Sequence, residues 1–335
     1  MRAAVRRRLP QLTARAGGVG PAASSHPDPY RNVDAQPDVA RMIQSLEERG
    51  RTRAQARLRR RFLRFAGIPK AGRVLEVGCG TGVVLRDLTT LVGPRGRVVG
   101  VDRSRRVIAA ARELCRAHPT ITLRVGDAAR LPFQSARFDA AIAVTVVLHV
   151  ADPLAMVNEM VRVTRRGGVI GLQDQDFGTL AVTHPDRELT DRILRGVADH
   201  VYEEPHSGRR LPGLLRAAGL AHVRLLTDVY QDTGLEPYTK TFLQRRAENA
   251  VRFGIVDAAT AERWLDGFTK LVADGAFVMT INYYGAVGVR GGGASIAPTT
   301  GRRRAAAFMR ARRSGRTERS ANGARRTGPW QRRAR

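Results

Sequence analysis

The sequence has few cysteines, few lysines and no long apolar run. Its two cysteines, Cys79 and Cys115, are too few for a disulfide framework, and they lack the Cys-x-x-Cys spacing of metal and redox motifs. We therefore expect a reducing, cytoplasmic compartment and no metal site. No apolar segment approaches the roughly 18–20 residues that a membrane-spanning helix needs, so no such helix is predicted.

Positive charge comes almost entirely from arginine, because the chain of 335 residues contains only three lysines. The formal net charge is +28, of which residues 1–25 carry +5 and residues 291–335 carry +12, leaving +11 for residues 26–290. More than half of the excess therefore lies at the two ends. Charge in end segments indicates unspecific attraction to nucleic acid rather than recognition, and no specific nucleic-acid partner is expected.

The compositions of the two end segments are typical of polypeptide segments that do not fold. Residues 1–27 are predicted to be a disordered extension; a misplaced start codon and a cleaved transit peptide are alternatives. Residues 291–335 contain neither leucine nor valine and cannot bury enough apolar surface to offset their ordering entropy. They are predicted to be a disordered arginine-rich tail, or a frameshifted end. Residues 28–290 are expected to form the folded domain.

Within that domain, short β-branched runs alternate with helical patterns. A helix is expected over residues 38–66, and further helices begin at Ser104 and at Asp152. Strands are expected at residues 73–77, 97–101, 121–125, 138–144 and 168–173. This rhythm predicts an α/β fold with a doubly wound, mostly parallel sheet and helices on both faces.

After residue 173 the alternation loosens. Residues 183–219 and 236–274 have helical patterns, and strands are expected at 222–230 and 277–289. We expect helical cap elements, at about 178–218 and 236–274, to lie over the carboxyl edge of the sheet. Ligands of open α/β sheets bind at that edge.

The sharpest local signal is a buried strand that runs into glycines at positions 78, 80 and 82. Such glycines let a ligand approach the backbone closely, and the helix that follows offers free N–H groups. The dinucleotide-binding fingerprint requires its third glycine at the position of Val83, which disfavours hydride transfer. No GxxxxGK[ST] phosphate-binding loop occurs in the sequence.

The glycine run, Val74 to Gly82, resembles motif I of the S-adenosylmethionine-dependent methyltransferases with a Rossmann-like fold. Further segments are similar to the same family in order and spacing: Val99–Asp102, Gly126–Ala128, Leu131–Phe133, Phe138–Ala143, Leu148-His149, Asp152-Pro153 and Arg165–Ile170. The resemblance covers about residues 30–230. It is closest to the small-molecule branch that contains ubiquinone- and menaquinone-biosynthesis methyltransferases, whereas residues 236–290 match no motif.

The resemblance implies S-adenosylmethionine as cofactor. Asp102 would bind both ribose hydroxyls, since a carboxylate can accept two hydrogen bonds from a diol, and Asp127 would contact the adenine amino group. An aromatic residue before the first helix, Tyr30, could close over the cofactor. The expected cofactor-binding residues are Glu76, Gly78, Cys79, Gly80, Gly82, Asp102, Arg103, Asp127, Ala128 and Thr145.

The implied reaction is direct displacement at the sulfonium methyl group by an oxygen, nitrogen or carbon nucleophile of a small organic acceptor. A neutral hydroxyl or carbon acid also needs a base. His149, Asp174 and Asp176 are the candidates, although an interior packing role for the histidine and solvated loop positions for the acids are equally open. Further polar residues are expected in the cap: Tyr202, His206 and Tyr283.

Two other functions stay open: an RNA or protein methyltransferase helped by the basic tails, and a cofactor-binding protein without catalysis. Adenine-N6 methylation is disfavoured because residues 143–146 lack the Asn/Asp-Pro-Pro-aromatic tetrad. Cytosine-C5 methylation is disfavoured because neither cysteine is placed as a nucleophile. The acceptor and the oligomeric state do not follow from the sequence.

Overall fold

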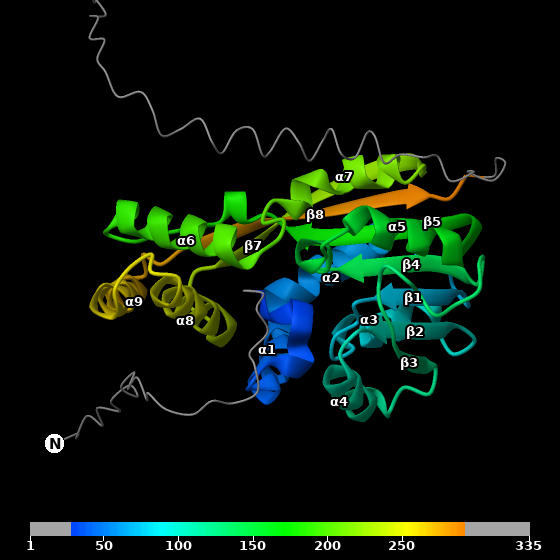
Figure 1. Ribbon diagram of the computed structural model, residues 1–335, viewed down its shortest axis with the longest axis horizontal. Coiled ribbons are helices and arrows are strands. Elements are labelled where there is room, and N and C mark those ends of the chain that lie inside the picture. The colour runs from blue at the N-terminus through cyan, green and yellow to red at the C-terminus, as the bar shows by residue number, and fades with distance from the viewer. Residues whose placement is uncertain (1–27, 292–335) are drawn as a thin grey trace, which may run out of the picture. The chain divides into compact units, whose positions relative to one another are not determined.

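The computed structural model describes residues 28–291 of the chain (Figure 1). The predicted N-terminal extension, and the predicted tail from residue 292 onward, lie outside the described residues. None of the helices in the described part combines the length and the apolar character that crossing a membrane requires.

An eight-stranded sheet forms the centre of the domain, in the order β3-β2-β1-β4-β5-β8-β6, with β7 also paired to β8. Strands β1 to β5 run parallel, and β8 runs antiparallel to β5, β6 and β7. The strands are β1 Arg73–Val77, β2 Arg97–Asp102, β3 Ile121–Val125, β4 Phe138–Val144, β5 Thr164–Gln175, β6 Ala181–Val182, β7 Ala221–Asp232 and β8 Met279–Val289. The mostly parallel α/β fold expected from the sequence is confirmed.

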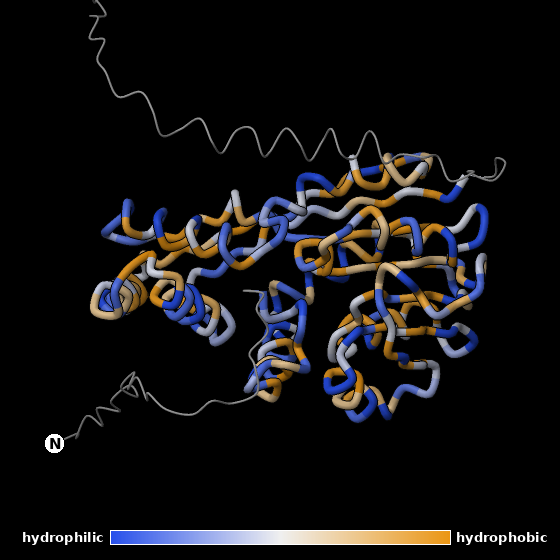
Figure 2. The backbone as a smooth tube through the Cα atoms, viewed as in Figure 1, coloured by the Kyte–Doolittle hydropathy of each residue, from blue (hydrophilic) through white to orange (hydrophobic). Residues whose placement is uncertain are grey.

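Helices cover both faces of the sheet. They are α1 Val39–Arg51, α2 Arg53–Ala66, α3 Val83–Val92, α4 Arg105–Cys115, α5 Pro153–Val163, α6 Arg187–Val201, α7 Ser207–Ala217, α8 Pro237–Arg252 and α9 Ala258–Ala273. Residues 28–291 also contain the 3₁₀ helices η1 Pro29–Ala35, η2 Val147–His149 and η3 Phe177–Thr179. Because side chains alternate along a strand, Val74 packs with α2 and α3, whereas Leu75 packs with α5 and α7. Figure 2 shows the resulting apolar strands at the centre of the domain.

The helix expected over residues 38–66 is two helices that meet at Thr52. Thr52 has extended backbone angles, and its side chain accepts a hydrogen bond from Gln55 N at 3.3 Å, which caps the start of α2. The single-helix prediction was therefore wrong, because the apolar periodicity continues across a capping residue. The break separates α2, which covers the sheet, from α1, which crosses the glycine loop: Leu46 approaches Gly80, and Val83 abuts Gly50.

Helices α6, α8 and α9 pack together around a second apolar cluster, beyond the carboxyl ends of the parallel strands (Figure 1). Trp264 is fully buried in this cluster, and its indole N–H donates to Thr190 Oγ1 at 2.9 Å. Of the expected cap range 178–218, α6 lies in this group, whereas Leu211 and Leu215 of α7 pack against the sheet. Helix α8, from the second expected cap range, faces the edge of the sheet where the strand-end motifs lie.

Replacing Phe62 with alanine tests the packing of α2 on the sheet. The Phe62 ring is fully buried, and it lies so close to Gly285 that a Cβ there would come within 2.7 Å of it. We expect Phe62→Ala to lower the free energy of unfolding by about 3–5 kcal/mol, because the lost ring leaves a cavity. Chemical denaturation measures the change. The control is Arg60→Ala at an exposed position of the same helix, whose free energy of unfolding should lie within about 0.5 kcal/mol of the wild type. Equal stability of the two variants would contradict this packing.

Candidate active site

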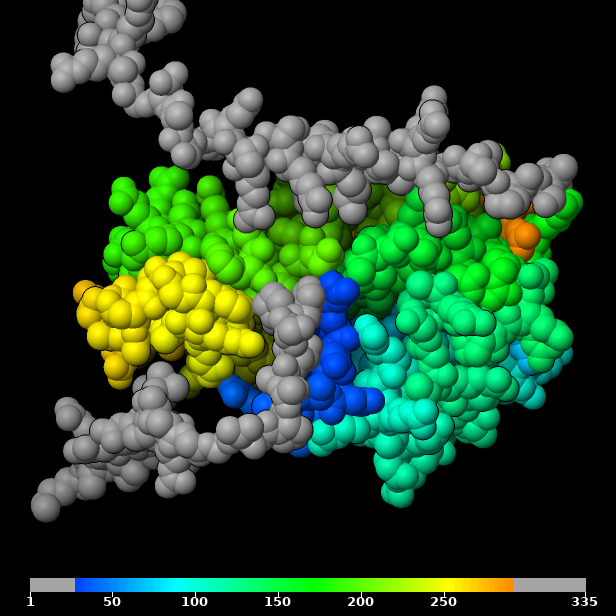
Figure 3. All heavy atoms as spheres, viewed as in Figure 1, coloured from blue at the N-terminus to red at the C-terminus, as the bar shows by residue number. Residues whose placement is uncertain are grey.

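A cavity of about 540 Å³ lies between the carboxyl ends of the strands, helix α1 and helix α8. Its volume is in the range of about 300–1,000 Å³ that small-molecule sites occupy. All of the expected cofactor-binding residues line it except Gly82. His149, Tyr30, Tyr202 and Tyr283 line it too, whereas Asp174, Asp176 and His206 do not. Figure 3 shows the elements around this region from the outside, with α1 in blue and the α8–α9 region in yellow.

The glycines after β1 each have a steric reason to be glycine. Gly78, Gly80 and Gly82 have φ values of 68°, 51° and 84°, a region that favours glycine. A Cβ on Gly78 would come within 2.5 Å of Val146, and one on Gly82 within 2.5 Å of the Cys115 sulfur. Gly82 therefore allows α3 to begin close to α4, while Gly78 and Gly80 border the cavity.

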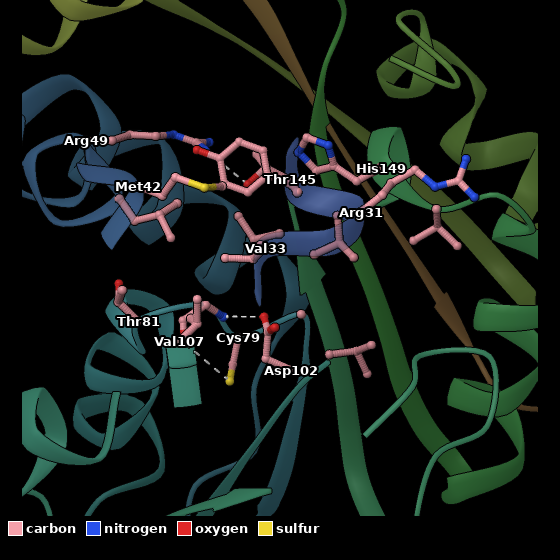
Figure 4. Close-up of a pocket in the computed structure, with 18 of the residues that line it drawn as sticks. Arg31, Val33, Met42, Arg49, Cys79, Thr81, Asp102, Val107, Thr145 and His149 are labelled. Carbon is pink, nitrogen blue, oxygen red and sulfur yellow. Dashed lines mark hydrogen bonds between the residues drawn. The ribbon is translucent and has the colours of Figure 1, made fainter. Parts of the chain in front are cut away.

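Asp102 ends β2 with its carboxylate fixed by backbone groups. Its Oδ2 accepts from Gly80 N and its Oδ1 from Ser104 N, both at 3.0 Å. Burial raises the pKa of Asp102, although these two hydrogen bonds favour its charged form. In Figure 4 the side chain lies beside Cys79 at the glycine loop. Each carboxylate oxygen keeps a lone pair with which to accept from a ligand hydroxyl.

Two buried polar atoms of the cavity wall have no hydrogen-bond partner among the described residues. They are Glu76 Oε2 and Thr81 Oγ1, on side chains that are 1% and 2% exposed. Burial raises the pKa of the Glu76 carboxyl well above its ordinary value. Since buried polar groups are almost always hydrogen-bonded, these atoms fit a polar ligand in the cavity.

Thr145 follows β4 in a strained conformation. Its φ is 54°, which costs free energy for a β-branched residue, and such strain concentrates at ligand-binding sites. Its hydroxyl accepts from Arg49 Nη1 at 3.2 Å, and Arg49 Nη2 donates to the Tyr283 hydroxyl at 3.4 Å. Figure 4 shows Arg49 reaching toward Thr145. No sequence motif indicated Arg49, because its place in the cavity depends on the break that separates α1 from α2.

His149 is held by a buried carboxylate. Its Nδ1 lies 2.6 Å from Asp28 Oδ2, and the Asp28 side chain has no exposed surface, whereas His149 is 18% exposed. With Nδ1–H donated to the carboxylate, Nε2 carries the lone pair. The imidazole ring also packs beside Tyr30 and Tyr202, with ring centroids 4.8 and 5.7 Å away. Sequence reasoning missed Asp28, which is 121 residues from its partner.

Asp174, which lies inside β5, and Asp176, which follows it, are engaged elsewhere; the strand runs to Gln175, two residues beyond the expected end. Asp174 is fully buried and accepts from the backbone N–H groups of Leu148 and Gln175, and burial raises its pKa to about 6. Asp176 is fully buried, accepts from Gly178 N at 2.9 Å and forms an ion pair with Arg209. Both carboxylates therefore hold backbone and neighbouring side chains at the end of β5.

The remaining predicted cofactor residues lie where β2 and β3 end. Asp127 is exposed and accepts from Ala129 N at 2.8 Å in the turn after β3. Arg103 is exposed next to Asp102, and Ala128 is partly buried. The opposite end of the cavity is formed by α8, which no sequence motif indicated, through Tyr238, Phe242, Arg245, Arg246 and Asn249.

Comparison with known proteins supports the interpretation of this site. A family model described as a methyltransferase domain matches residues 74–168, the segment from β1 to β5 that carries the glycine loop and both strand-end acids. This part of the chain is a methyltransferase domain. It has the Rossmann-like fold of the S-adenosylmethionine-dependent enzymes.

Relatives of the methyltransferase domain align over part of their length. A 37.1 kDa protein in transposon TN4556 of Streptomyces fradiae is 34% identical over 212 residues, 63% of this chain and 60% of that protein. Demethylmenaquinone methyltransferase of Staphylococcus aureus is 33% identical over 124 residues, 37% of this chain and 52% of that enzyme. The chain thus spans about half to three fifths of these relatives.

Among solved structures, the [4+2]-cyclase SpnF has a TM-score of 0.50 at 20% identity, over 81% of this chain and 100% of that one. At this identity the likeness shows the fold alone. The same architecture thus occurs in a protein whose name states a cyclisation, and the reaction has to be inferred from the site.

Asn substitution of Asp102 tests the cofactor end of the methyltransferase domain. We expect Asp102→Asn to weaken binding of S-adenosylhomocysteine by about 10- to 100-fold, because a charge-assisted hydrogen bond contributes about 1.5–3 kcal/mol. Isothermal titration calorimetry measures the affinity. Asp191→Asn, at an exposed acid on α6, is the matched control and should bind as the wild type does. Unchanged affinity of Asp102→Asn would remove this residue from the site.

We expect cofactor binding to release a proton from the buried Glu76 carboxyl. Because burial raises the pKa of the Glu76 carboxyl, it binds a proton over a pH range in which an ordinary glutamate is ionised. A cationic ligand lowers that pKa, so binding releases a proton, and affinity rises with pH across the range. Calorimetry in buffers of different ionisation enthalpy counts the protons. Glu76→Gln should abolish the release, and an equal count in that variant would contradict the assignment.

Proposed function

We propose that this domain transfers the methyl group of S-adenosylmethionine to a small organic acceptor by direct displacement. The observation that carries the proposal is that one cavity joins the glycine loop and strand-end acids to a second region formed by His149 and α8. A site that holds both reactants in one cavity lowers the barrier by aligning the nucleophile, the methyl group and the leaving sulfur. The described residues supply such a site.

At the cofactor end, the chain offers groups that match each part of S-adenosylmethionine. When bound, this cofactor supplies an electrophilic methyl group on a positively charged sulfur. Asp102 would accept hydrogen bonds from the ribose diol, and Asp127 would face the adenine amino group. The amino-acid part would then lie toward Glu76 and Arg49, whose opposite charges suit an ammonium and a carboxylate.

At the acceptor end, His149 has the geometry of a general base. Asp28 fixes the Nδ1–H tautomer, so Nε2 would accept the proton of an acceptor hydroxyl whose oxygen takes the methyl group, with S-adenosylhomocysteine as the leaving group. The aromatic side chains of Tyr30 and Tyr202 flank the imidazole and limit access of water.

The dimensions of the site favour a small acceptor over RNA or protein. The cavity is bounded by α1 on one side and by α8 on the other. The Staphylococcus aureus relative is named for demethylmenaquinone, a small molecule, which supports the same class. The basic ends that motivated the RNA alternative lie outside the described residues, and a cytoplasmic location stays a prediction.

A screen of acceptors tests the proposal. The full chain is incubated with S-adenosylmethionine and a panel of small hydroxyl, amine and carbon-acid acceptors, with RNA and protein samples in parallel, and S-adenosylhomocysteine is quantified. Product with a small acceptor is the expected result. Cofactor binding without product from any sample would overturn the proposal in favour of a cofactor-binding protein without catalysis or an enzyme of a different reaction. Product with RNA or protein alone would overturn the acceptor class.

His149→Gln tests the proposed base. With a hydroxyl acceptor from the screen, we expect kcat to fall by about 10²- to 10⁴-fold while the Kd for S-adenosylhomocysteine changes little, because proton transfer is lost and cofactor contacts remain. Asp28→Asn should show a smaller loss, through the wrong tautomer. The control is His200→Gln at an exposed histidine on α6. Wild-type turnover by His149→Gln, or a loss confined to cofactor binding, would contradict the role.

A further inference from the structure

Arg246 is a buried cation without an acidic partner. Its side chain is on α8, lines the cavity and is 3% exposed. Its one hydrogen bond within the described residues runs from Nη2 to the Tyr202 hydroxyl at 3.1 Å, and it forms no ion pair there. Burying a charge in this way is costly unless something in the site compensates for it.

Aromatic rings compensate for part of this cost. The guanidinium carbon lies 4.5 Å from the centroid of the Phe177 ring, 4.7 Å from that of Phe242 and 5.3 Å from that of Tyr202. Such rings attract a cation through their faces and accept no hydrogen bond in the guanidinium plane, so the N–H groups other than the one that donates to Tyr202 have no acceptor within the described residues. Those in-plane donors form the fork that binds a carboxylate or phosphate in a bidentate manner.

The acidic side chains of the surrounding segments are paired with other arginines. Glu203 forms an ion pair with Arg31 at 2.9 Å, and Glu248 forms one with Arg41 at 3.3 Å. Glu204 is paired with Arg210. None of these three acids forms an ion pair with Arg246 within the described residues.

Acidic and basic residues are distributed unevenly around the cavity. Its acidic residues come from the strand ends and the start of α5, whereas arginines line it on every side: the acids are Glu76, Asp102, Asp127 and Asp152. Helix α8 contributes no acid to the lining, and it contributes a second cation, Arg245, which makes no ion pair within residues 28–291. Tyr238 and Phe242 surround this cationic end with apolar surface. Among the residues that face Arg246, the nearest polar partner is a neutral hydroxyl.

We propose that the acceptor carries an anionic group, a carboxylate or a phosphate, that pairs with Arg246, next to a flat apolar body that packs against the aromatic residues of the cap. This inference rests on the proposed function, because it names the class of molecule that occupies the acceptor end. An acceptor of this kind supplies Arg246 with the negative charge that residues 28–291 do not provide. Arg246 then orients it with respect to His149 and the methyl group.

Binding of simple probes tests the proposal. The full chain is saturated with S-adenosylhomocysteine, so that the carboxylate of the cofactor is already in place, and is titrated with benzoate, phenyl phosphate and the neutral benzamide by calorimetry. We expect at least one anionic probe to bind tenfold or more tightly than benzamide. The two anions distinguish a carboxylate site from a phosphate site.

Variants of Arg246 assign the preference. Arg246→Gln should reduce the difference between anion and benzamide to less than twofold, Arg246→Lys should retain part of it, and both should bind S-adenosylhomocysteine within about twofold of the wild type. Arg252→Gln, at an exposed arginine of the same helix, is the matched control and should keep the full preference.

Three results would overturn the proposal: no anion preference in the wild type, a full preference that survives Arg246→Gln, or a large loss of S-adenosylhomocysteine affinity in that variant, which would assign Arg246 to the cofactor. The comparison of benzoate with benzamide on the wild type decides the first point even where a variant fails to fold. An anion preference without methyl transfer would overturn the proposed function alone, whereas methyl transfer without an anion preference would overturn this inference alone.

Discussion

Burying charged groups away from water is the constraint on which this site depends. A buried ion is stable in a protein only when an opposite charge, hydrogen bonds or a ligand replaces its hydration. The chain satisfies that requirement at Asp176 with Arg209 and at Asp174 with two backbone N–H groups. Among the described residues, Glu76 Oε2 has no hydrogen-bond partner, and Arg246 has aromatic faces and a neutral hydroxyl but no acid; both side chains line the same cavity.

The fold explains how these groups come together. Parallel strands bring the loop after β1 and the acid at the end of β2 to one edge, and α1 and the cap then enclose that edge. The glycines let the backbone approach a ligand, while the rigid sheet keeps the strand-end side chains in place. The sheet end of the cavity is thus built from local sequence, and the α8 end from segments that are far apart along the chain.

The sequence predicted the first of these ends and missed most of the second. Strands β1 to β4 and the glycine loop follow from short-range patterns, because a buried parallel strand and a tight turn each restrict the residues they accept. Arg49, Asp28 and Arg246 act through contacts with residues distant in sequence, which no local pattern encodes. The break at Thr52 was hidden by continuous apolar periodicity.

The acids at the end of β5 illustrate the same limit. Asp174 lies inside the strand and Asp176 directly follows it, but position at an edge does not determine whether a carboxylate faces the ligand or the backbone. Asp174 faces the N–H groups of Leu148 and Gln175, and its raised pKa reflects burial. The histidine of the same neighbourhood does line the cavity, where it contacts Asp28 and the rings of Tyr30 and Tyr202.

The central claim is that the cavity binds S-adenosylmethionine at the sheet end and an acceptor at the α8 end. A crystal structure with S-adenosylhomocysteine tests it most directly. The account predicts the ribose on Asp102, a hydrogen bond to the buried Glu76 oxygen, and open space between the cofactor sulfur, His149 and Arg246. Cofactor that fills the α8 end, or that binds outside this cavity, would contradict it.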